Sequence, residues 1–374
     1  MIAQCLIIGT LVIAGQMEYF KNKNLGFNKE AVIGISIPDN KKETLESFRS
    51  RLERNSNISN ISFSIGAPTS SNNFGTSYFL SEGDSKDVFV VSVKPVDRHY
   101  LTTYGISLVA GRWFTESDEK LADPLLPRDQ QQHVYIMNES AVKRLGFNKP
   151  EDILGKSVTT GVNRIKSEVV GVVNDFHVSS LHDEIKPVIL MNFPEFYYEA
   201  GIKVNAGQLR ETVKYIEAQW TALYPDSYFE YFFLDEELAK LYRQDERTFT
   251  LFKIFAGVSI FIGCLGLYGL ISFMANQKLK EVGIRKVMGA SVASIVVLFS
   301  KDFIRLIVIA FVIAAPLAWY FMNQWLQGFA YHIDIHWSVF LISILSTLCI
   351  ALLTVSYRSI RAAVSNPSET LRTE

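Results

Sequence analysis

Few residues in this chain have the types and the spacing that chemistry requires. Ser117 and Lys120 match the S-x-x-K spacing of serine acyl-enzymes, but the companion motifs S-D-N and K-T-G do not occur in the sequence. His332 and His336 flank Asp334 and could form a metal pair on an extended segment, yet no further strong ligand is close in sequence. We therefore interpret the first pair as part of a solvated loop and the histidines as part of a loop at a membrane boundary.

The common nucleotide-binding and hydrolase motifs are also missing. The sequence contains no G-x-x-x-x-G-K-[ST], no G-x-S-x-G and no H-E-x-x-H, so it cannot cradle phosphates in the manner of a P-loop. Asp175, His177 and His182 are interpreted as the end of a strand that turns into a loop. The sequence therefore predicts no catalytic residue, no metal site and no cofactor in this chain.

A basic segment, residues 274–291, lies between two long apolar runs. Residues 250–273 contain one charged residue, Lys253, and residues 303–322 contain one, Arg305. Each run is long enough to cross about 30 Å of hydrocarbon. The charged residues of the segment between them are Lys278, Lys280, Glu281, Arg285 and Lys286. The segment is therefore predicted to lie at a face of the membrane.

The distribution of basic residues predicts the topology. Residues 323–337 contain no Lys or Arg, whereas residues 274–291 are basic, so the basic segment is assigned to the cytoplasm and the following loop to the opposite side. A last span at residues 338–357 precedes Arg358 and Arg361, which places the tail, residues 358–374, in the cytoplasm. We expect residues 292–322 to hold an amphipathic segment and the third span.

Residues 1–16 form a first apolar run that is short for a span and lacks the basic region of a signal peptide. We interpret it as a truncated first membrane helix, and the absence of a cation before Lys21 favours a chain that is the later part of a longer polypeptide. An uncleaved short anchor is the alternative.

Composition agrees with a membrane protein. The chain has 374 residues, of which 48% are hydrophobic, and the formal net charge is −1. The apolar spans account for the hydrophobic excess, and there is no general basic field for nucleic acid. Cys5, Cys264 and Cys349 all lie within apolar runs, so neither a disulfide framework nor a cysteine metal site is expected.

The block from residue 17 to residue 234 is predicted to form an extracytoplasmic α+β domain. Each of its ends shows a strand, a helix and a strand, and the two ends can pair in one split β-α-β layer. The first helix is expected to be capped by Asp39 or Asn40. The predicted elements are strands at 31–37, 58–65, 201–204 and 228–234, with a helix at 209–223.

Residues 66–199 are predicted to be a subdomain inserted into that layer, residues 28–65 and 200–234. The β-branched runs indicate strands at 88–96, 134–137, 169–173 and 188–191. A helix capped by Asn138 should end at Gly146. Residues 116–132 lack a period and are predicted to be an exposed loop.

The stretch after the domain, residues 235–249, repeats apolar residues at helical spacing and runs without a breaker into the second span. We expect one continuous helix that transmits displacement between the domain and the membrane, with a plain amphipathic connector as the alternative. Small residues form two stripes for close helix packing. These stripes are Ser259, Gly263 and Gly266 in the second span and Ala310, Ala314 and Ala318 in the third.

Two motifs resemble a known family. Residues 280–291, K-E-V-G-I-R-K-V-M-G-A-S, resemble the signature loop of FtsX-like permeases, the membrane subunits of MacB-type ABC transporters. Residues 366–372, N-P-S-E-T-L-R, resemble the family's C-terminal N-P-x-x-x-L-R ending. The outer block is similar, more loosely, to the MacB-like periplasmic core domain with its porter and inserted Sabre subdomains. The matching stretches are residues 138–146, 154–156 and 169–176.

The resemblance implies a topology and a set of partners. One membrane helix precedes the outer domain and three follow it, and ATP is bound by a separate ABC ATPase rather than by a domain fused to this chain as in MacB itself. Larger relatives contain two copies of this four-helix unit, so a second permease unit is expected, either as a homodimer or as the first half of a longer permease. A periplasmic adaptor or an outer-membrane channel is a further possible partner.

The basic segment is then the surface on which the ATPase acts. We expect Lys280, Arg285 and Lys286 to steer the partner and Val282, Ile284 and Val287 to supply an apolar anchor, because exposed ion pairs contribute only about 0 to 1 kcal/mol. Gly283 and Gly289 would allow close approach or a helix stop, and Glu281 and Ala290 complete the expected interface. The alternative is that the cations only hold the orientation of the chain in the membrane.

Together these patterns predict a non-enzymatic permease subunit in a bacterial inner membrane, embedded in lipid, with no nucleic acid as partner. It would couple ATP hydrolysis by its partner to movement of the outer domain and so export or extract drugs, peptides or lipoproteins. The rival prediction is an FtsX-like signal transducer that activates a cell-wall hydrolase or a sensor kinase without moving a substrate.

Overall fold

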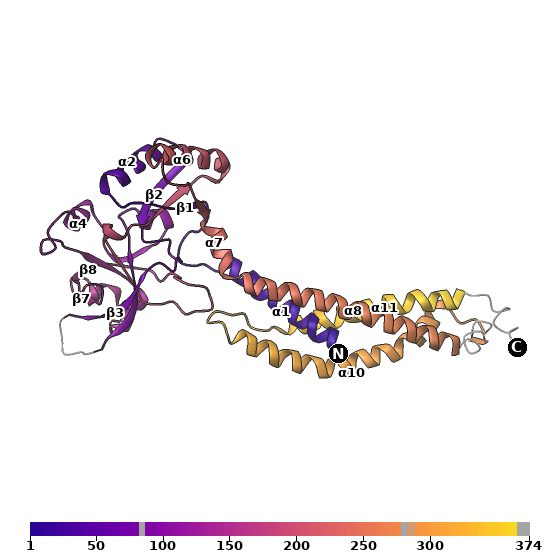
Figure 1. The fold of residues 1–374 in the computed structure, drawn as a ribbon. Helices are drawn as coiled ribbons and strands as arrows, with labels where there is room; N and C mark the ends of the chain where they lie inside the picture. The colour runs from indigo at the N-terminus through magenta and orange to yellow at the C-terminus, as the bar shows by residue number, and fades with distance from the viewer. Residues whose placement is uncertain (82–86, 278–283, 286–287, 365–374) are drawn as a thin grey trace. The chain divides into compact units, whose positions relative to one another are not determined.

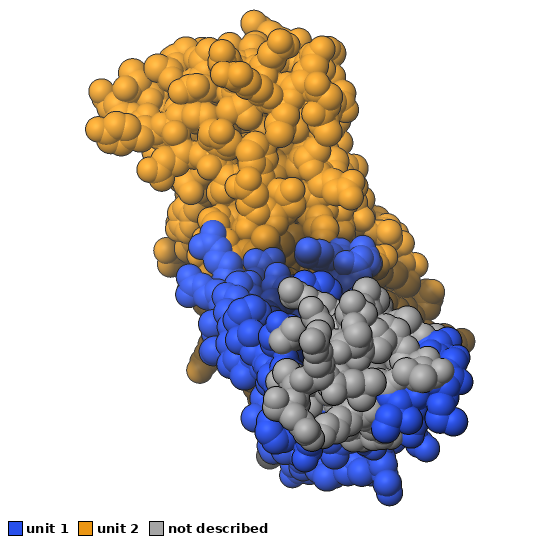
Figure 2. Space-filling model, turned by 90° about the vertical axis from the view of Figure 1, so that its right-hand side faces the viewer, with its two compact units in different colours: residues 1–22, 243–374 blue, residues 23–242 orange. Residues whose placement is uncertain are grey.

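The computed structural model describes residues 1–81, 87–277, 284–285 and 288–364. The chain divides into two compact units, which Figure 2 shows in different colours. Residues 1–22 and 243–374 form one, called here the helical unit. Residues 23–242 form the other, called the β-rich unit.

The helical unit contains four helices that are long and apolar enough to cross a membrane: α1 (Ile2–Asn22), α8 (Arg243–Gln277), α10 (Val292–Leu326) and α11 (Trp337–Val364). The first apolar run was expected to end near residue 16, but α1 continues to Asn22 and has 21 residues. Helix α1 contacts each of the other three (Figure 1). Its side chains Ile8 and Val12 are completely buried, so α1 is the helix around which this unit packs.

The β-rich unit contains a four-stranded sheet in the order β11-β1-β10-β2, with each neighbouring pair antiparallel. This order matches the predicted split β-α-β layer, because the outer strands come from opposite ends of the unit. The strands are β1 (Val32–Ser36), β2 (Ile58–Ser64), β10 (Glu199–Val204) and β11 (Tyr231–Phe233), and the helices are α2 (Lys42–Leu52) and α6 (Leu209–Leu223).

An aromatic core joins α2 and α6 of this layer. Phe48 of α2 lies edge-on to Trp220 of α6 with ring centroids 5.8 Å apart, and both side chains are at most 1% exposed. The expected cap of α2 was wrong. The helix begins after Lys41 with no side-chain cap, while Asp39 accepts a hydrogen bond from the Lys41 amide at 3.1 Å and so forms a turn before the helix.

A seven-stranded sheet forms the rest of the β-rich unit, in the order β5-β8-β6-β9-β4-β3-β7. An additional pairing of β7 with β8 joins the described strands from β7 to β8 into a closed ring, to which β5 is attached. Tyr78 and Tyr135 are completely buried in the core cluster of this sheet. The strands are β3 (Phe74–Leu80), β4 (Phe89–Pro95), β5 (Leu108–Gly111), β6 (Val134–Asn138), β7 (Ser157–Thr160), β8 (Lys166–Val173) and β9 (Val188–Met191).

Three short helices accompany this sheet: α3 (Tyr100–Tyr104), α4 (Glu116–Leu121) and α5 (Glu139–Arg144). Helix α5 has the predicted cap, because the Asn138 side chain accepts a hydrogen bond from the Ala141 amide, and Gly146 follows it with φ of 88°. The prediction of an exposed loop over 116–132 was wrong at its start. Thr115 and Asp118 form a capping box that begins α4, a signal that the sequence did contain.

The expected single helix through residues 235–273 is divided in the structure. Helix α7 (Leu234–Leu241) ends before Tyr242, whose φ of −107° and ψ of 8° are not helical, and α8 begins at Arg243. The Tyr242 hydroxyl accepts a hydrogen bond of 3.0 Å from the Leu181 amide. This hydrogen bond joins Tyr242, at the interruption, to Leu181 of the β-rich unit.

Candidate functional site

Between α8 and α10 the structure describes four residues that are predicted to contact an ATPase, Ile284, Arg285, Gly289 and Ala290, and also their neighbour Met288. The other predicted interface residues lie outside the described residues, and these are Lys280, Glu281, Val282, Gly283, Lys286 and Val287.

The described part is a helical turn with a defined end. The Met288 amide donates to the Ile284 carbonyl at 3.0 Å, and the Ala290 amide donates to the Arg285 carbonyl at 2.9 Å. Gly289 has φ of 89°. A bond from the residue after a left-handed glycine to a carbonyl five residues back is the pattern of a Schellman ending. Gly289 therefore stops the turn, as the sequence predicted.

A new helix follows this ending directly. The Ser291 side chain caps α10 by accepting a hydrogen bond of 3.2 Å from the Ser294 amide. The turn and the start of α10 thus follow each other within a few residues, and both ends of the connection are capped. Such a connection is short and defined in geometry, which suits a surface that a partner pushes on.

Two apolar side chains of this turn are exposed. Ile284 is 55% exposed and Met288 is 81% exposed. Neither is used in the core of the described chain, so both are available as anchors for a partner, and buried apolar anchors dominate binding energies. Ile284 is one of the predicted interface residues, whereas Met288 is not, although methionine side chains are adaptable in contacts.

The alanine stripe of α10 packs within the chain. Ala314 is completely buried and Ala318 is 5% exposed, and Ala318 belongs to a cluster with Ile8 and Val12 of α1. The Cys5 thiol of α1 lies 3.6 Å from the Ala314 carbonyl. Ala310, nearer the start of α10, is only partly buried.

The glycine stripe of α8 differs. A methyl group added at Gly263 or Gly266 would meet no atom within 4 Å. Ser259 and Gly263 border a cavity of about 90 Å³ that α1, α10 and α11 also line. The stripe is therefore not filled by a neighbouring helix in the described part of this chain.

Two stretches that carry the family resemblance meet in the structure. Asp175, which follows β8, accepts hydrogen bonds from the Ser140 amide at 2.8 Å, the Ser140 hydroxyl at 2.7 Å and the Asn138 side chain at 2.9 Å. Strands β6 and β8 are parallel neighbours, so their C-terminal ends lie side by side. These polar residues fasten the start of α5 to the sheet, which is a structural role.

The other candidates for chemistry have ordinary surroundings. Lys120 forms an ion pair of 2.8 Å with Glu116 on the exposed face of α4. The imidazole of His332 lies 3.2 Å from the Ile333 carbonyl. Among the described residues no group of three His, Cys, Asp or Glu side chains is placed to hold a metal ion.

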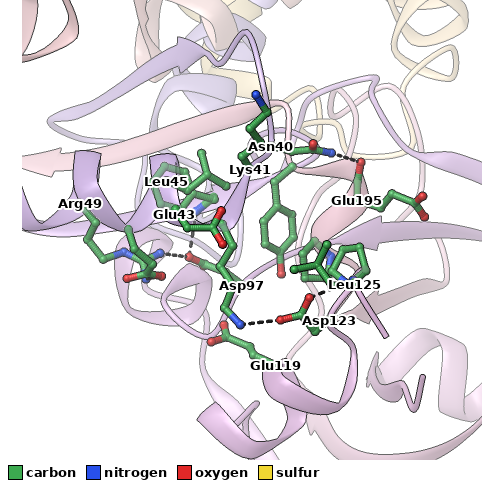
Figure 3. A pocket seen from close by; sticks show the side chains of 16 residues that line it. Asn40, Lys41, Glu43, Leu45, Arg49, Asp97, Glu119, Asp123, Leu125 and Glu195 are labelled. Atoms are coloured by element: carbon green, nitrogen blue, oxygen red, sulfur yellow. Dashed lines mark hydrogen bonds and ion pairs between the residues drawn. The ribbon is translucent and has the colours of Figure 1, made fainter. Parts of the chain in front are cut away.

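The structure also contains a pocket that the sequence did not indicate. It has a volume of about 240 Å³ and lies in the β-rich unit between α2 and the segment that follows α4 (Figure 3). The pair Arg49 and Asp97, with a distance of 2.6 Å, lies in its wall. Pairs of residues so distant in sequence leave no local pattern, which explains why the pocket was missed.

Comparisons with known proteins agree with these features. The model of the MacB-like periplasmic core domain matches residues 6–220, and the model of the FtsX-like permease C-terminal domain matches residues 253–367. No curated protein sequence matches the chain.

Solved structures show a more distant similarity. The periplasmic region of MacB from Actinobacillus actinomycetemcomitans is 16% identical, with a TM-score of 0.40, over 59% of this chain and 96% of that one. The extracellular domain of the ABC-type transporter YknZ from Gram-positive bacteria is also 16% identical, with a TM-score of 0.36, over 54% of this chain and 97% of that one. The family models carry the assignment, because one of them spans more than half of the chain. The chain belongs to the family of FtsX-like permeases with a MacB-like periplasmic core domain, and is a membrane component of an ABC transporter with a domain outside the cytoplasm.

Proposed function

We propose that this chain is the permease subunit of a mechanotransmission ABC transporter in a bacterial inner membrane. In this proposal a separate ATPase binds and hydrolyses ATP in the cytoplasm, and the β-rich unit changes conformation on the other side of the membrane to export or extract drugs, peptides or lipoproteins. The chain itself carries no catalytic residue and no cofactor. A second permease unit completes the membrane part, and a periplasmic adaptor or outer-membrane channel receives the cargo.

The observation that carries the proposal is the described end of the connection before α10, residues 284–285 and 288–290. It ends at Gly289, connects directly to α10 and exposes Ile284 and Met288. A partner that binds these apolar side chains can push on α10 through a connection of only a few residues. The signature residues of the family lie in the same segment, which supports its role as the ATPase contact.

The test is to replace Ile284 with Asp in the chain expressed together with its ATPase. An aspartate at the anchor should weaken retention of the ATPase and uncouple ATP hydrolysis from transport, because an apolar anchor cannot bury a charge without loss. Arg285→Gln is the matched control at the neighbouring position. It should have a small effect, since an exposed charge contributes about 0 to 1 kcal/mol.

Normal coupling in the Ile284→Asp protein would remove the docking proposal and leave the cations with a topogenic role only. Cleavage of the segment at Lys280 or Lys286 by trypsin added from the cytoplasmic side checks that the topology is intact in both variants. The purified chain should show no ATPase activity without its partner, and hydrolysis by the chain alone would contradict the assignment.

The proteins that copurify with the complex decide between transport and signalling. An adaptor or an outer-membrane channel supports export, whereas a cell-wall hydrolase or a sensor kinase supports the FtsX-like alternative. Both readings share the ATPase contact, so this measurement is separate from the Ile284 experiment.

A further inference from the structure

The pocket in the β-rich unit has a wall of mixed chemistry. Its polar side includes Glu43 in the first turn of α2, Glu119 within α4 and Asp123 after α4, as Figure 3 shows. Its apolar side includes Phe63 and Tyr197, both at most 5% exposed, together with Leu45. Leu125 stands beside it and is 83% exposed. A ligand that fits must therefore offer both an apolar and a polar part.

The charges around the pocket are unbalanced toward negative. Six carboxylates line it against three cations. Arg49 is paired with Asp97 at 2.6 Å and with Glu46 at 3.0 Å. No described Lys, Arg or His forms an ion pair with the Glu43 or Glu195 carboxylate. The excess of negative charge in a partly enclosed cavity attracts a cation.

The side chain of Lys42 shows which group the pocket accepts. It extends from the first residue of α2 to Asp123, where its ammonium lies 2.7 Å from the carboxylate. The Lys42 side chain is 53% exposed and the Asp123 side chain is 18% exposed. The carboxylate is therefore only partly exposed in the wall of the pocket, while the cation reaches it from a half-exposed position and can leave at little cost.

Glu119 supplies a second carboxylate in the same wall. Glu119 accepts hydrogen bonds from the Arg98 amide at 2.9 Å and from the Arg98 guanidinium at 3.0 Å. Its orientation toward the pocket is thus maintained by a residue outside the pocket. Burial raises the pKa of Glu119, whereas the hydrogen bond from the Arg98 amide and the charge of its guanidinium favour the ionised form.

We propose that this pocket binds an ammonium or guanidinium group carried on a short apolar arm, and that the bound cation takes the place of Lys42 at Asp123. The volume of about 240 Å³ lies below the range of about 300 to 1,000 Å³ that is usual for drug-sized ligands. The pocket therefore takes a group of the size of one side chain, either on a polypeptide or on a small free amine. The proposal concerns binding alone and holds whether or not the coupling to an ATPase is correct.

The experiment measures binding to the full chain in lipid nanodiscs by calorimetry. The probes are N-acetyl-lysinamide, its neutral analogue N-acetyl-norleucinamide, and n-pentylamine. Both amines should bind and the neutral analogue should not. Tighter binding of the lysinamide assigns a polypeptide as the source of the cation, and equal binding of pentylamine assigns a free amine.

The variants test the displacement of Lys42. Lys42→Met removes the competing cation, so it should tighten binding of the amines about two- to fivefold. Lys41→Met removes the same charge one residue earlier, from a residue that forms no ion pair with a described residue, and should change binding less than Lys42→Met. Asp123→Asn should weaken binding about fivefold or more, with thermal melting of each variant measured to confirm folding.

Three results would each overturn the proposal. These are equal binding of the neutral analogue, equal effects of Lys41→Met and Lys42→Met, and unchanged binding in a folded Asp123→Asn protein. The second result would mean that only the general negative field acts on the amines.

Discussion

Strands of the β-rich unit bury side chains such as Val93 and Ile189 completely, whereas α8 of the helical unit leaves Phe261 and Leu265 more than half exposed. Within the helical unit α1 is more buried than α8: of the most apolar 18 residues of each helix, 39% are buried in α1 and 11% in α8. The β-rich unit thus covers its own core. The helical unit is built around α1 and leaves the outer faces of its other helices for lipid or for another membrane helix.

The two units also differ in the chemistry of the buried polar side chains that bond to loop backbone. In the β-rich unit the completely buried Lys94 donates to the carbonyls of Ala67 and Ser70 at 3.1 and 2.9 Å. In the helical unit the Gln16 side chain donates to the Tyr331 carbonyl and accepts from the Ile333 amide, both at 2.9 Å. The β-rich unit thus buries a charged side chain among carbonyls, whereas the buried amides of the helical unit include those of Gln4 and Gln16, which are neutral.

The largest effect is expected from breaking the buried ion pair of the β-rich unit. Asp97 accepts from Arg49 at 2.6 Å, from the Ser62 hydroxyl at 2.7 Å and from the Phe63 amide at 2.9 Å. Asp97→Ala leaves Arg49 buried and without this partner, so it should lower the free energy of unfolding by about 3 to 5 kcal/mol. Thermal and denaturant unfolding of the full chain in detergent measure the loss.

The matched control for this prediction is Asp183→Ala. Asp183 is paired with Lys186 at 3.1 Å, but both side chains are about half exposed. The control should change the free energy of unfolding by about 0 to 1 kcal/mol. Equal effects of the two substitutions would show that burial does not distinguish these pairs.

The second effect is a pH dependence in the same unit. Burial raises the pKa of Glu199 from 4.5 to about 7. Between these values the folded chain holds a proton that the unfolded chain has released, so stability falls as the pH rises from 4.5 to 7. Lys94, whose pKa burial lowers to about 8, remains protonated in both states over this window.

Glu199→Gln should therefore remove most of this slope, which amounts to at most about 3 kcal/mol. Melting temperatures of the full chain at pH 5 and pH 7 give the measurement, with Glu53→Gln on the surface as a control that keeps the slope. A slope that survives in the Glu199→Gln protein would assign the pH dependence to other groups.

A smaller effect tests the packing of the helical unit. Ala314→Leu inserts a larger side chain where α10 faces α1 and no exposed surface remains. Overpacking of this kind costs about 1 to 3 kcal/mol. This cost is measured by heating the protein in detergent and determining the fraction that remains folded and monodisperse. Val312 lies on the same helix and is 66% exposed, so the Val312→Leu protein should be as stable as the unchanged chain.

The smallest effect sharpens the contrast between the two stripes. Gly263→Ala should leave the stability of the isolated chain unchanged within about 1 kcal/mol, because the added methyl group meets no atom within 4 Å. If the glycine stripe contacts a second permease unit, the same substitution should reduce crosslinking between two units. A clear loss of stability in the single chain would instead show that the stripe packs within it.

The sequence by itself determined the elements that depend on local patterns. The apolar runs indicated four apolar helices, although the first was expected to be short and α1 has 21 residues. Helical periodicity gave α6 the bounds Leu209–Leu223 that the structure has. Side-chain chemistry at turns identified the cap Asn138 and the stops Gly146 and Gly289. These features are set by residues within a few positions of each other, so a single sequence contains their full signal. Ile284 of the predicted interface is exposed in the structure, and its contact with an ATPase stays a prediction.

Only the tertiary structure decided the features that join distant residues. Strands β3 and β7 have weak patterns of their own, and their backbone groups are satisfied by partners in the ring, while β5 pairs at its edge with β8. Tyr242 interrupts a helix that its local sequence favours, and its hydroxyl accepts a hydrogen bond from the amide of Leu181, 61 positions away. Likewise, Lys42 and Asp123 line the same pocket although 81 positions separate them in the sequence. Contacts at such separations depend on the fold as a whole, which no local pattern records.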